Sequence, residues 1–468
     1  MTGKFRTDRD GLGPIEVPSQ ALYSAGTARA LQNFEGIGEP LSAFPDYVGA
    51  LVKVKKAAAV TNHRLGAIGE DISLAIVQAC DEVHSGEHLV DFAVPLFEGS
   101  GGTSTNMNVN EVLANRAGQI LGSELGQFDK VHPNDHVNRG QSTNDVVPSA
   151  VKLACFMKTE PLLESLFRLT QSFQKMAAET DEFLRVGRTC MQAAQPMTYG
   201  QLFLAYATSI ERAKAELIER RKNLNVVPMG ATAIGTGLGA VEGFGDLIGQ
   251  ELTAAFGFEV SIPENLFDAM QMADGFSRFS AELRVTAEVI GKIGADLVVL
   301  SSDGPSGLGE VLLPTIQPGS SIMAGKVNPV MPMLVQQIAM QVQGNDFAVS
   351  SAALHGQMEI NHFEPVIAKA LFDSLAVMTS GYRHFSEKCV AGLRVDWERS
   401  FENLVNSSAL SSVFLEVLGY QTVSELVKFA KARSISLAEL AAEEGLISSA
   451  EIRTSLKKAA KGLPLEAS

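Results

Sequence analysis

Residues 270–302 read MQMADGFSRFSAELRVTAEVIGKIGADLVVLSS, a stretch with alanine and leucine throughout that is longer than most helices of globular proteins. Three more stretches of this kind lie at 149–178, 197–223 and 330–355. Helices of such length expose wide apolar faces unless other helices cover them. The sequence therefore predicts a mainly α protein built on a long central helical bundle, and it predicts an oligomer.

The composition is typical of an ordered globular protein. The chain has 468 residues, of which 46% are hydrophobic and 19% are charged, and this length allows two or three domains. The net charge of −15 argues against a non-specific nucleic-acid binder. The four cysteines form no CxxC pair, the first 18 residues contain no apolar signal segment, and no apolar stretch is long enough to span a membrane. We therefore expect a cytoplasmic protein.

Turn-rich segments divide the chain into three expected domains. The first covers residues 1–141 and is mostly helical after an irregular start of about 40 residues, which are rich in Gly, Pro and Ser. The long helices occupy residues 142–395. Residues 396–468 form a small C-terminal domain of two or three short helices.

Three polar loops with glycines interrupt the apolar helical pattern. They are GTSTN at 102–106, QSTND at 141–145 and GSSIMAGKVNP at 319–329, which we call the serine loop. Their hydroxyl, amide and backbone N–H groups are suited to binding carboxylates. Helix capping is the better explanation of any one loop by itself, because Ser, Thr and Asn commonly precede helices. The three together, with Lys326, exceed what capping requires. A fourth segment, GRTC at 187–190, would mean little alone.

In this order, the four segments resemble the aspartase/fumarase superfamily. The serine loop is similar to that family's GSSxxMPxKxNP motif, and GTSTNMNVNEVLANRA and HPNDHVNRGQSTNDVVP are similar to its two other motifs. The resemblance runs nearly end to end, and class II fumarases and aspartate ammonia-lyases are the most similar branch. It implies a three-domain, fumarase/aspartase-like fold. It also implies a homotetramer in which each active site collects its loops from three subunits.

The resemblance implies an anti elimination beside a carboxylate that needs no metal or organic cofactor. Ser320 matches the base that removes a proton from the carbon next to the carboxylate. A serine is not basic at neutral pH, so nearby N–H groups and positive charge must stabilise its alkoxide. Lys326 and Asn328 match the residues that hold the carboxylate on which negative charge develops. The residues that match positions for the second carboxylate are Thr103, Ser142, Thr143 and Ser321, and those near the leaving group are Asn144, Thr189 and Cys190.

Two of the leaving-group positions depart from the family's pattern. Cys190 stands where fumarases have a His and many aspartases have a Gln or His, and Met333 stands where fumarases have the Glu that pairs with this His. Expelling hydroxide needs a proton donor or an organised water, whereas an ammonium leaves as a neutral amine. The departure therefore favours C–N over C–O cleavage. A pocket lined by Cys and Met also suits a bulkier amine or a thiol.

We predict a carbon–nitrogen lyase that eliminates ammonia or an amine from aspartate or a related amino acid, giving fumarate or an analogous unsaturated acid. Three alternatives stay open: an amine lyase for a bulkier substrate, such as one that releases trimethylamine from a betaine, a fumarate hydratase, and a catalytically silent homologue. The retained Ser320, Lys326 and Asn328 argue against the silent homologue. The expected partners are a small carboxylate and further copies of the chain, without nucleic acid or membrane.

Overall fold

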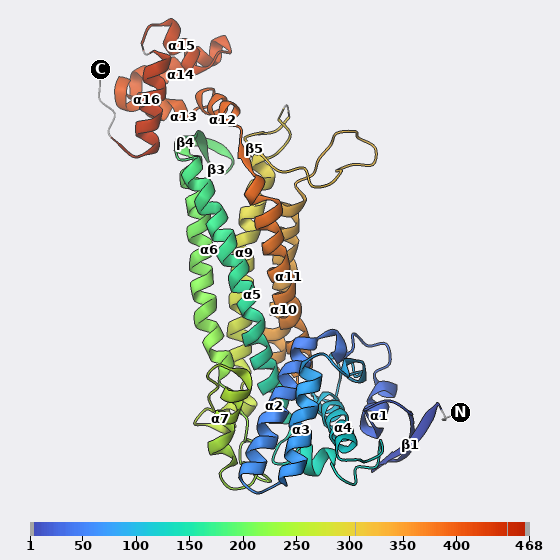
Figure 1. Ribbon diagram of the computed structural model, residues 1–468. Coiled ribbons are helices and arrows are strands. Elements are labelled where there is room, and N and C mark those ends of the chain that lie inside the picture. The colour runs from blue at the N-terminus through green and yellow to red at the C-terminus, as the bar shows by residue number, and fades with distance from the viewer. Residues whose placement is uncertain (1–3, 305, 447, 464–468) are drawn as a thin grey trace. The chain divides into compact units, whose positions relative to one another are not determined.

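The chain forms a mainly helical protein, as the sequence predicts (Figure 1). The computed structural model describes residues 4–304, 306–446 and 448–463. The helices of its first half are α1 (Ala25–Asn33), α2 (Pro45–Arg64), α3 (Glu70–His84), α4 (Thr103–Ile120), α5 (Thr143–Glu179), α6 (Tyr199–Arg221), α7 (Phe244–Phe256) and α8 (Leu266–Gln271). Those of its second half are α9 (Asp274–Leu300), α10 (Val330–Leu354), α11 (Glu364–Lys388), α12 (Trp397–Val405), α13 (Ala409–Leu418), α14 (Tyr420–Arg433), α15 (Leu437–Glu443) and α16 (Ser449–Ala460).

The described strands form three antiparallel pairs. These pairs are β1 (Phe5–Asp10) with β2 (Gly13–Pro18), β3 (Leu184–Thr189) with β4 (Gln192–Thr198), and β5 (Val311–Leu312) with β6 (Arg394–Val395). β3 and β4 form a hairpin that carries the GRTC segment. β5 lies just before the serine loop. The β3–β4 and β5–β6 sheets therefore position two of the polar segments that the sequence singled out.

Contacts between residues divide the chain into two units. Unit 1 consists of Met1–Pro161, Glu216–Arg284 and Gln341–Ala376, and unit 2 consists of Leu162–Ala215, Val285–Met340 and Val377–Ser468. Helices α5, α6, α9, α10 and α11 contribute residues to both units. This division does not test the three domains expected at 1–141, 142–395 and 396–468, which stay a prediction.

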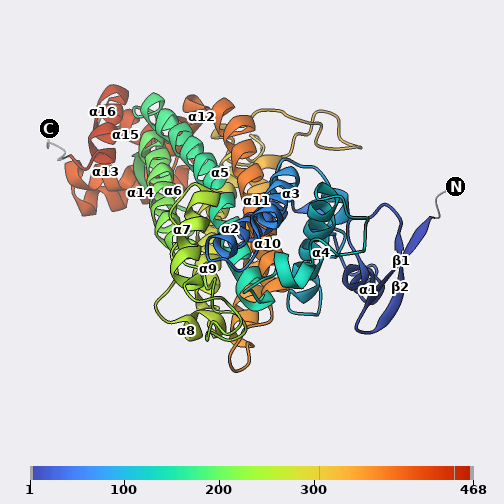
Figure 2. The same cartoon turned by 60° about the horizontal axis from the view of Figure 1, so that its bottom comes forward.

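In unit 1, helix α2 packs against α3 and α7, α3 packs against α4, and α4 packs against α1 (Figure 2). The expected irregular start of the chain is wrong, because β1, β2 and α1 lie there. Arg6 of β1 donates hydrogen bonds to the carbonyl oxygens of Ala21 (2.7 Å) and Tyr23 (2.6 Å), which ties the hairpin to the segment before α1. The Gly and Pro content of the segment predicted irregular structure, because contacts between residues far apart along the chain are not visible in its composition.

In unit 2, segments of five long helices pack together, and α9 approaches α10 closely. A Cβ atom at Gly294 of α9 would lie 2.5 Å from a methyl group of Val335 and 2.7 Å from the carbonyl oxygen of Pro332, so only glycine fits there. This contact joins the last turns of α9 to the first turns of α10. The serine loop is part of the connection between these two helices, and the contact holds the two ends of that whole connection.

The β3–β4 hairpin shares a hydrophobic core with the C-terminal helices of unit 2. Leu184 and Val186 of β3 pack with buried residues of α12–α16, such as Leu410 and Phe414. The expectation of two or three short helices is wrong, because the described part of residues 396–468 contains five, α12 to α16. Serine capping boxes begin α15 and α16, and such local signals let short helices follow one another.

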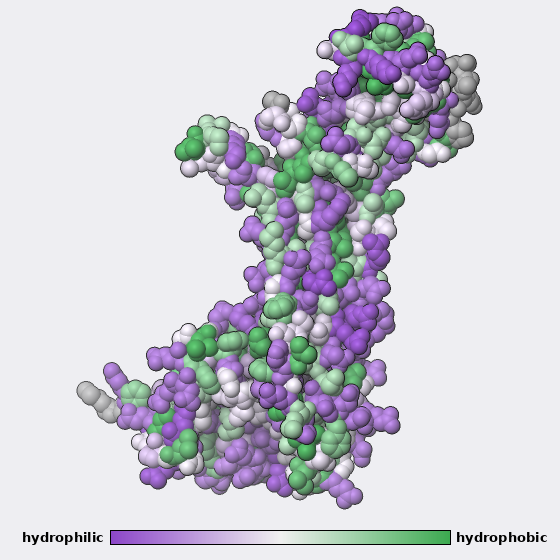
Figure 3. All heavy atoms as spheres, turned by 180° about the vertical axis from the view of Figure 1, so that it is seen from behind, coloured by the Kyte–Doolittle hydropathy of each residue, from purple (hydrophilic) through white to green (hydrophobic). Residues whose placement is uncertain are grey.

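The sequence anticipated four of the long helices, which are present as α5, α6, α9 and α10, and it missed α11. Apolar side chains remain exposed along them, and green residues lie among purple ones on the face in Figure 3. Members of this exposed apolar set are Phe167, Leu204, Val285, Met340, Phe347 and Val377. An oligomer would cover such residues, and the oligomeric state stays a prediction. None of the helices in the described ranges combines the length and apolar character that a bilayer crossing requires.

Candidate active site

The first polar motif of unit 1 begins helix α4. Gly102 adopts a left-handed conformation with φ of 87°, and its N–H donates to the Glu98 carboxylate at 2.8 Å. A Cβ atom at Gly102 would lie 2.9 Å from Val147, so the start of α4 packs against the first turns of α5. Thr103, the first residue of α4, is exposed. The segment expected as a loop is therefore a helix N-terminus, where the helix dipole favours anions.

The second polar motif begins helix α5 and forms a capping arrangement. The backbone N–H of Ser142 donates to Asp145 Oδ1 at 2.9 Å, and Ser142 Oγ accepts the N–H of Asn144 at 3.2 Å. Asp145 is fully buried, and its other oxygen accepts the N–H of Thr232 at 2.9 Å. Burial raises the pKa of Asp145 to about 7, against the lowering effect of these hydrogen bonds. The buried Asp145 thus fixes the turn that presents Ser142, Thr143 and Asn144.

A buried lysine lies under the same turn. Lys55 of α2 has no exposed surface, and its Nζ donates to Asn138 Oδ1 at 2.8 Å and to Gln141 Oε1 at 3.0 Å. Burial lowers the pKa of Lys55 to about 7, while the Asp145 carboxylate acts in the opposite direction. Sequence reasoning did not select Lys55. A signal was present, because this lysine lies one helical turn from Leu51 on the apolar face of α2.

In unit 2, the β3–β4 hairpin presents Thr189 and Cys190 at its exposed tip. Thr189 pairs with Gln192, so Cys190 and Met191 form a two-residue turn. Both have positive φ, 50° and 63°, in a turn that normally takes Asn and Gly. Non-glycine residues in this conformation cost free energy, and such strain is commonest at functional sites.

A buried carboxylate joins the β3–β4 hairpin to the segment that precedes β5 and the serine loop. Glu310, which precedes β5, is fully buried and forms a paired hydrogen bond with the Arg188 guanidinium. The Tyr199 hydroxyl (3.0 Å) and the Asn403 amide (3.0 Å) also donate to it. Burial alone would raise the pKa of Glu310, but the hydrogen bonds and charge of Arg188 outweigh it and lower that pKa. Sequence reasoning missed this residue, because its partners lie far along the chain.

The serine loop itself is held by few contacts. Ser320 Oγ accepts the backbone N–H groups of Ile322 (3.2 Å) and Met323 (3.0 Å). The Asn328 amide donates to the carbonyl oxygen of Gly319 at 2.8 Å and closes the loop on itself. Most of the loop is exposed, and Ile322 has 88% of its surface accessible. Two N–H groups therefore point at the Ser320 oxygen within a segment that has little other support.

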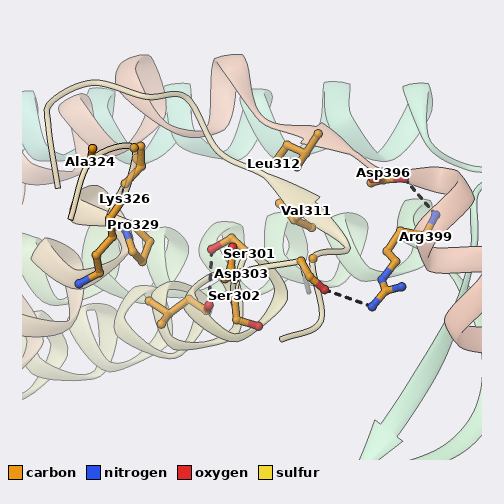
Figure 4. Close-up of a pocket in the computed structure, with 15 residues that line it drawn as sticks. Ser301, Ser302, Asp303, Val311, Leu312, Ala324, Lys326, Pro329, Asp396 and Arg399 are labelled. Atoms are coloured by element: carbon orange, nitrogen blue, oxygen red, sulfur yellow. Dashed lines mark hydrogen bonds between the residues drawn. The ribbon is translucent and has the colours of Figure 1, made fainter. Parts of the chain in front are cut away.

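A cavity of about 1150 Å³ lies beside the serine loop in unit 2. Lys326 lies at one end of it and Arg399 at the other (Figure 4). Arg399 is engaged, because its guanidinium donates to the carbonyl oxygen of Gly304 at 3.2 Å. Lys326 is exposed and forms no ion pair with the residues that the structure describes. Ser320 and Asn328 do not line this cavity.

One cluster among the described residues has side chains that are able to share a cation. Glu82, Glu87 and His88 lie close together in unit 1. Arg116 already forms two hydrogen bonds with Glu82, and they lower the pKa of that carboxyl to about 2. Because an arginine balances the charge, we assign no metal to this cluster.

Comparison with known proteins decides the family. The sequence profile of a family described as lyases matches residues 13–344. Aspartate ammonia-lyase of Pseudomonas fluorescens is 40% identical over 447 residues, which are 95% of this chain and 94% of that protein. Class II fumarate hydratase of Ralstonia nicotianae is 38% identical over 443 residues, 94% of this chain and 96% of that protein. The chain belongs to the fumarase/aspartase superfamily.

A solved member of the superfamily has the same fold. The crystal structure of a fumarate lyase (delta crystallin) from Brucella melitensis bound to cobalt matches with a TM-score of 0.93 and 38% identity, covering 98% of this chain and all of that one. The mainly α, fumarase-like fold expected from the sequence is therefore confirmed. The chain is a lyase by family, as the sequence motifs predicted.

The ten predicted site residues fall into two groups, one in each unit. Thr103, Ser142, Thr143 and Asn144 are in unit 1, and Thr189, Cys190, Ser320, Ser321, Lys326 and Asn328 are in unit 2. The contact between Gly102 and Val147 brings the first group together at two helix starts. Met333, in the first turn of α10, is also in unit 2 and is 43% exposed. The roles of these residues stay predictions.

Proposed function

We propose that the chain eliminates ammonia, or a related amine, from aspartate or a similar amino acid to give fumarate or an analogous unsaturated acid. The likeness to aspartate ammonia-lyases over nearly the whole chain supports this reaction. In the proposed step, Ser320 takes a proton from the carbon beside one carboxylate. The C–N bond then breaks and its electron pair leaves with the nitrogen, so an ammonium group departs as neutral ammonia.

The observation that carries the proposal is the pair of N–H groups at Ser320. Ile322 and Met323 donate to its oxygen, which is where negative charge develops when the serine acts as a base. Lys326 is the cation of the same loop, and with Asn328 it would hold the carboxylate that gains charge. Because the loop closes on itself through Asn328 and is otherwise exposed, it is suited to fold over a bound substrate.

The start of α5 would bind the second carboxylate. Ser142 Oγ and Thr143 Oγ1 each already accept a hydrogen bond, so their hydroxyl protons are free for a ligand. Thr103 and Ser321 would add two more hydroxyls, while Asn144 and Thr189 would lie near the leaving group. Such neutral donors at a helix N-terminus match a carboxylate.

The leaving-group end favours nitrogen over oxygen. Met333 has no proton to give and the Cys190 thiol is a weak donor, so these two residues do not replace the His–Glu pair of fumarases when hydroxide has to leave. A fumarate hydratase is the second candidate, because a class II fumarate hydratase is also a relative at 38% identity. A bulkier amine is the third, because the exposed hairpin tip presents the uncharged side chains of Cys190 and Met191.

We further propose a homotetramer in which loops from three subunits form each site. The exposed apolar residues of the long helices support an oligomer, since a solvated monomer gains nothing from them. Light scattering coupled to gel filtration measures the mass. A monomer of 49.9 kDa at micromolar concentration would contradict the proposal.

Ultraviolet absorbance of the purified protein with L-aspartate, L-malate or N-substituted aspartates, offered separately, tests the reaction. We expect release of the unsaturated acid from aspartate or from an N-substituted aspartate and slow release from malate. Rapid release from malate alone would replace the proposal with a fumarate hydratase. Release from none of them would indicate a different amine or a silent homologue.

A further inference from the structure

Asn106 connects the starts of the two helices that form the proposed carboxylate site. This residue of α4 is 2% exposed. Its side-chain Nδ2 lies 3.3 Å from Thr143 Oγ1 and 3.2 Å from Asn138 Oδ1. One amide therefore contacts both the first residue of α5 and a member of the Lys55 network.

The neighbouring amides have fixed orientations. The Asn138 NH2 group donates to the carbonyl oxygen of Gln141 at 3.2 Å, and the Gln141 NH2 group donates to that of Val137 at 3.0 Å. Both side-chain oxygens then face Lys55 Nζ, which donates to them. Whether charged or neutral, the lysine nitrogen has at least two N–H groups, one for each oxygen. Lys55 therefore makes Asn138 Oδ1 an acceptor.

This acceptor sets the orientation of Asn106. The opposite orientation would place the Asn106 oxygen against Asn138 Oδ1, and two amide oxygens at that distance repel. Asn106 must turn its NH2 group toward Asn138, and the same group reaches Thr143. Its own oxygen is buried without a hydrogen-bond partner among the residues that the structure describes. The orientation of the Asn106 amide is therefore determined by its contact with Asn138 and Lys55, and not by a hydrogen bond of its own oxygen.

The consequence lies at Thr143. Its hydroxyl oxygen accepts from Asn106, so its proton is left for donation, and none of the described residues accepts it. Thr143 is half-buried and within reach of a ligand. We infer that Asn106 is a positioning residue that makes the Thr143 hydroxyl a donor to the substrate carboxylate. The inference rests on the proposed function, which assigns a carboxylate to Thr143.

Succinate binding to the full-length protein, measured by calorimetry, tests the inference through Asn106→Asp. A carboxylate at this position only accepts, so it captures the Thr143 proton that the ligand needs. We expect succinate to bind roughly tenfold to a hundredfold more weakly, the size of one hydrogen bond to a charged group. The matched control is Asn110→Asp on the same buried face of α4, where Nδ2 contacts Met107 Sδ at 3.8 Å. We expect this control to change affinity less than about twofold, well within one hydrogen bond.

A double-mutant cycle with Thr143→Val separates positioning from general damage. Without the hydroxyl there is nothing left to orient, so Asn106→Asp should add little in this background. Two results would overturn the inference. One is an equal loss of succinate affinity from Asn106→Asp in the unmodified protein and in Thr143→Val, and the other is a loss from Asn110→Asp as large as that from Asn106→Asp. If Asn106→Asp does not fold, Asn106→Ala replaces it in the same cycle, with an expected loss of about tenfold.

The same preparations distinguish this inference from the proposed reaction. If the unmodified protein binds succinate but releases no fumarate from aspartate, the proposed reaction fails while the cycle still decides the role of Asn106. If it releases fumarate and the cycle is additive, only the inference fails. If it binds no succinate, the inference fails, because Thr143 then holds no carboxylate of this ligand, and the proposed reaction fails as well only if aspartate yields no fumarate.

Discussion

The start of α5 and the serine loop are both rich in hydroxyl and amide groups, yet the protein holds them in opposite ways. Below Ser142 and Thr143 lie buried titratable and amide groups, including Asp145 and Lys55, which fix the backbone and side chains. The serine loop has no such layer. Its hydrogen bonds run mainly between its own residues, and most of its surface is exposed.

The difference fits the two tasks that we propose for these regions. A site that binds a carboxylate gains from fixed donors, because no free energy is then spent on orienting them when the ligand arrives. A loop that brings a base to the substrate must first admit that substrate, and a loosely held segment is able to close afterwards. Variants in each region test this division.

Ser320→Ala should lower kcat for amine release by roughly a hundredfold to ten-thousandfold, the contribution typical of a general base. The melting temperature should not change, because Ser320 lies in a weakly held loop. Single-turnover kinetics and thermal unfolding measure the two quantities. Ser350→Ala, on the exposed face of α10, is the control. A variant with normal kcat would remove Ser320 from the chemistry.

Thr143→Val should raise KM, and the Kd of succinate, by roughly tenfold to a hundredfold, because it removes one donor to a charged group. The effect on kcat should be smaller than that of Ser320→Ala. Thr159→Val on the same helix is the control, since its hydroxyl donates only within the helix, to the carbonyl oxygen of Cys155. An unchanged KM would show that the fixed region does not bind the substrate.

Glu364→Gln tests how well unit 1 excludes water at the start of α11, where Glu364 is buried. Burial raises the pKa of Glu364 to about 8 from 4.5. The folded state therefore holds a proton that the unfolded state loses, and stability falls as pH rises from 4.5 toward 8. The variant lacks this loss, so its melting temperature should exceed that of the unmodified protein by roughly 5 °C at pH 8 and by little at pH 4.5. A difference that does not depend on pH would contradict the burial.

Replacing the hairpin tip by Cys190→Asn with Met191→Gly should relieve backbone strain. Asn and Gly are the residues that this turn favours, so we expect about 1–2 kcal/mol of added stability. If Cys190 contacts the substrate, KM should change at the same time, and Met191→Gly alone separates the two effects. Added stability with unchanged KM would make Cys190 a residue of the turn only.

The family and the polar motifs could be recognised from the sequence, because both depend on local patterns of residues. It also indicated four long helices from their apolar residues. It did not indicate α11, the β1–β2 hairpin or the number of C-terminal helices, which depend on contacts between distant segments. For the same reason it gave no role to Asn106, which lies in the first polar motif, and it missed Glu310, because their partners become visible only when the chain is folded. The motifs at 102–106 and 141–145 were expected as loops, although their Ser, Thr and Asn residues begin helices.

Mixed oligomers test the central claim most directly, namely that a fixed binding region and a mobile base loop from different subunits form one site. Ser320→Ala and Thr143→Val chains, each with its own tag, are expressed together, and hybrids carrying both tags are isolated. If the two regions come from different chains, a tetramer with two chains of each variant regains on average roughly a third of its sites, because each site draws its two regions from two different chains. At aspartate concentrations well below the KM of the Thr143→Val variant, fumarate formation well above that of either variant alone is the predicted result. Activity no higher than that of the separate variants would contradict the account.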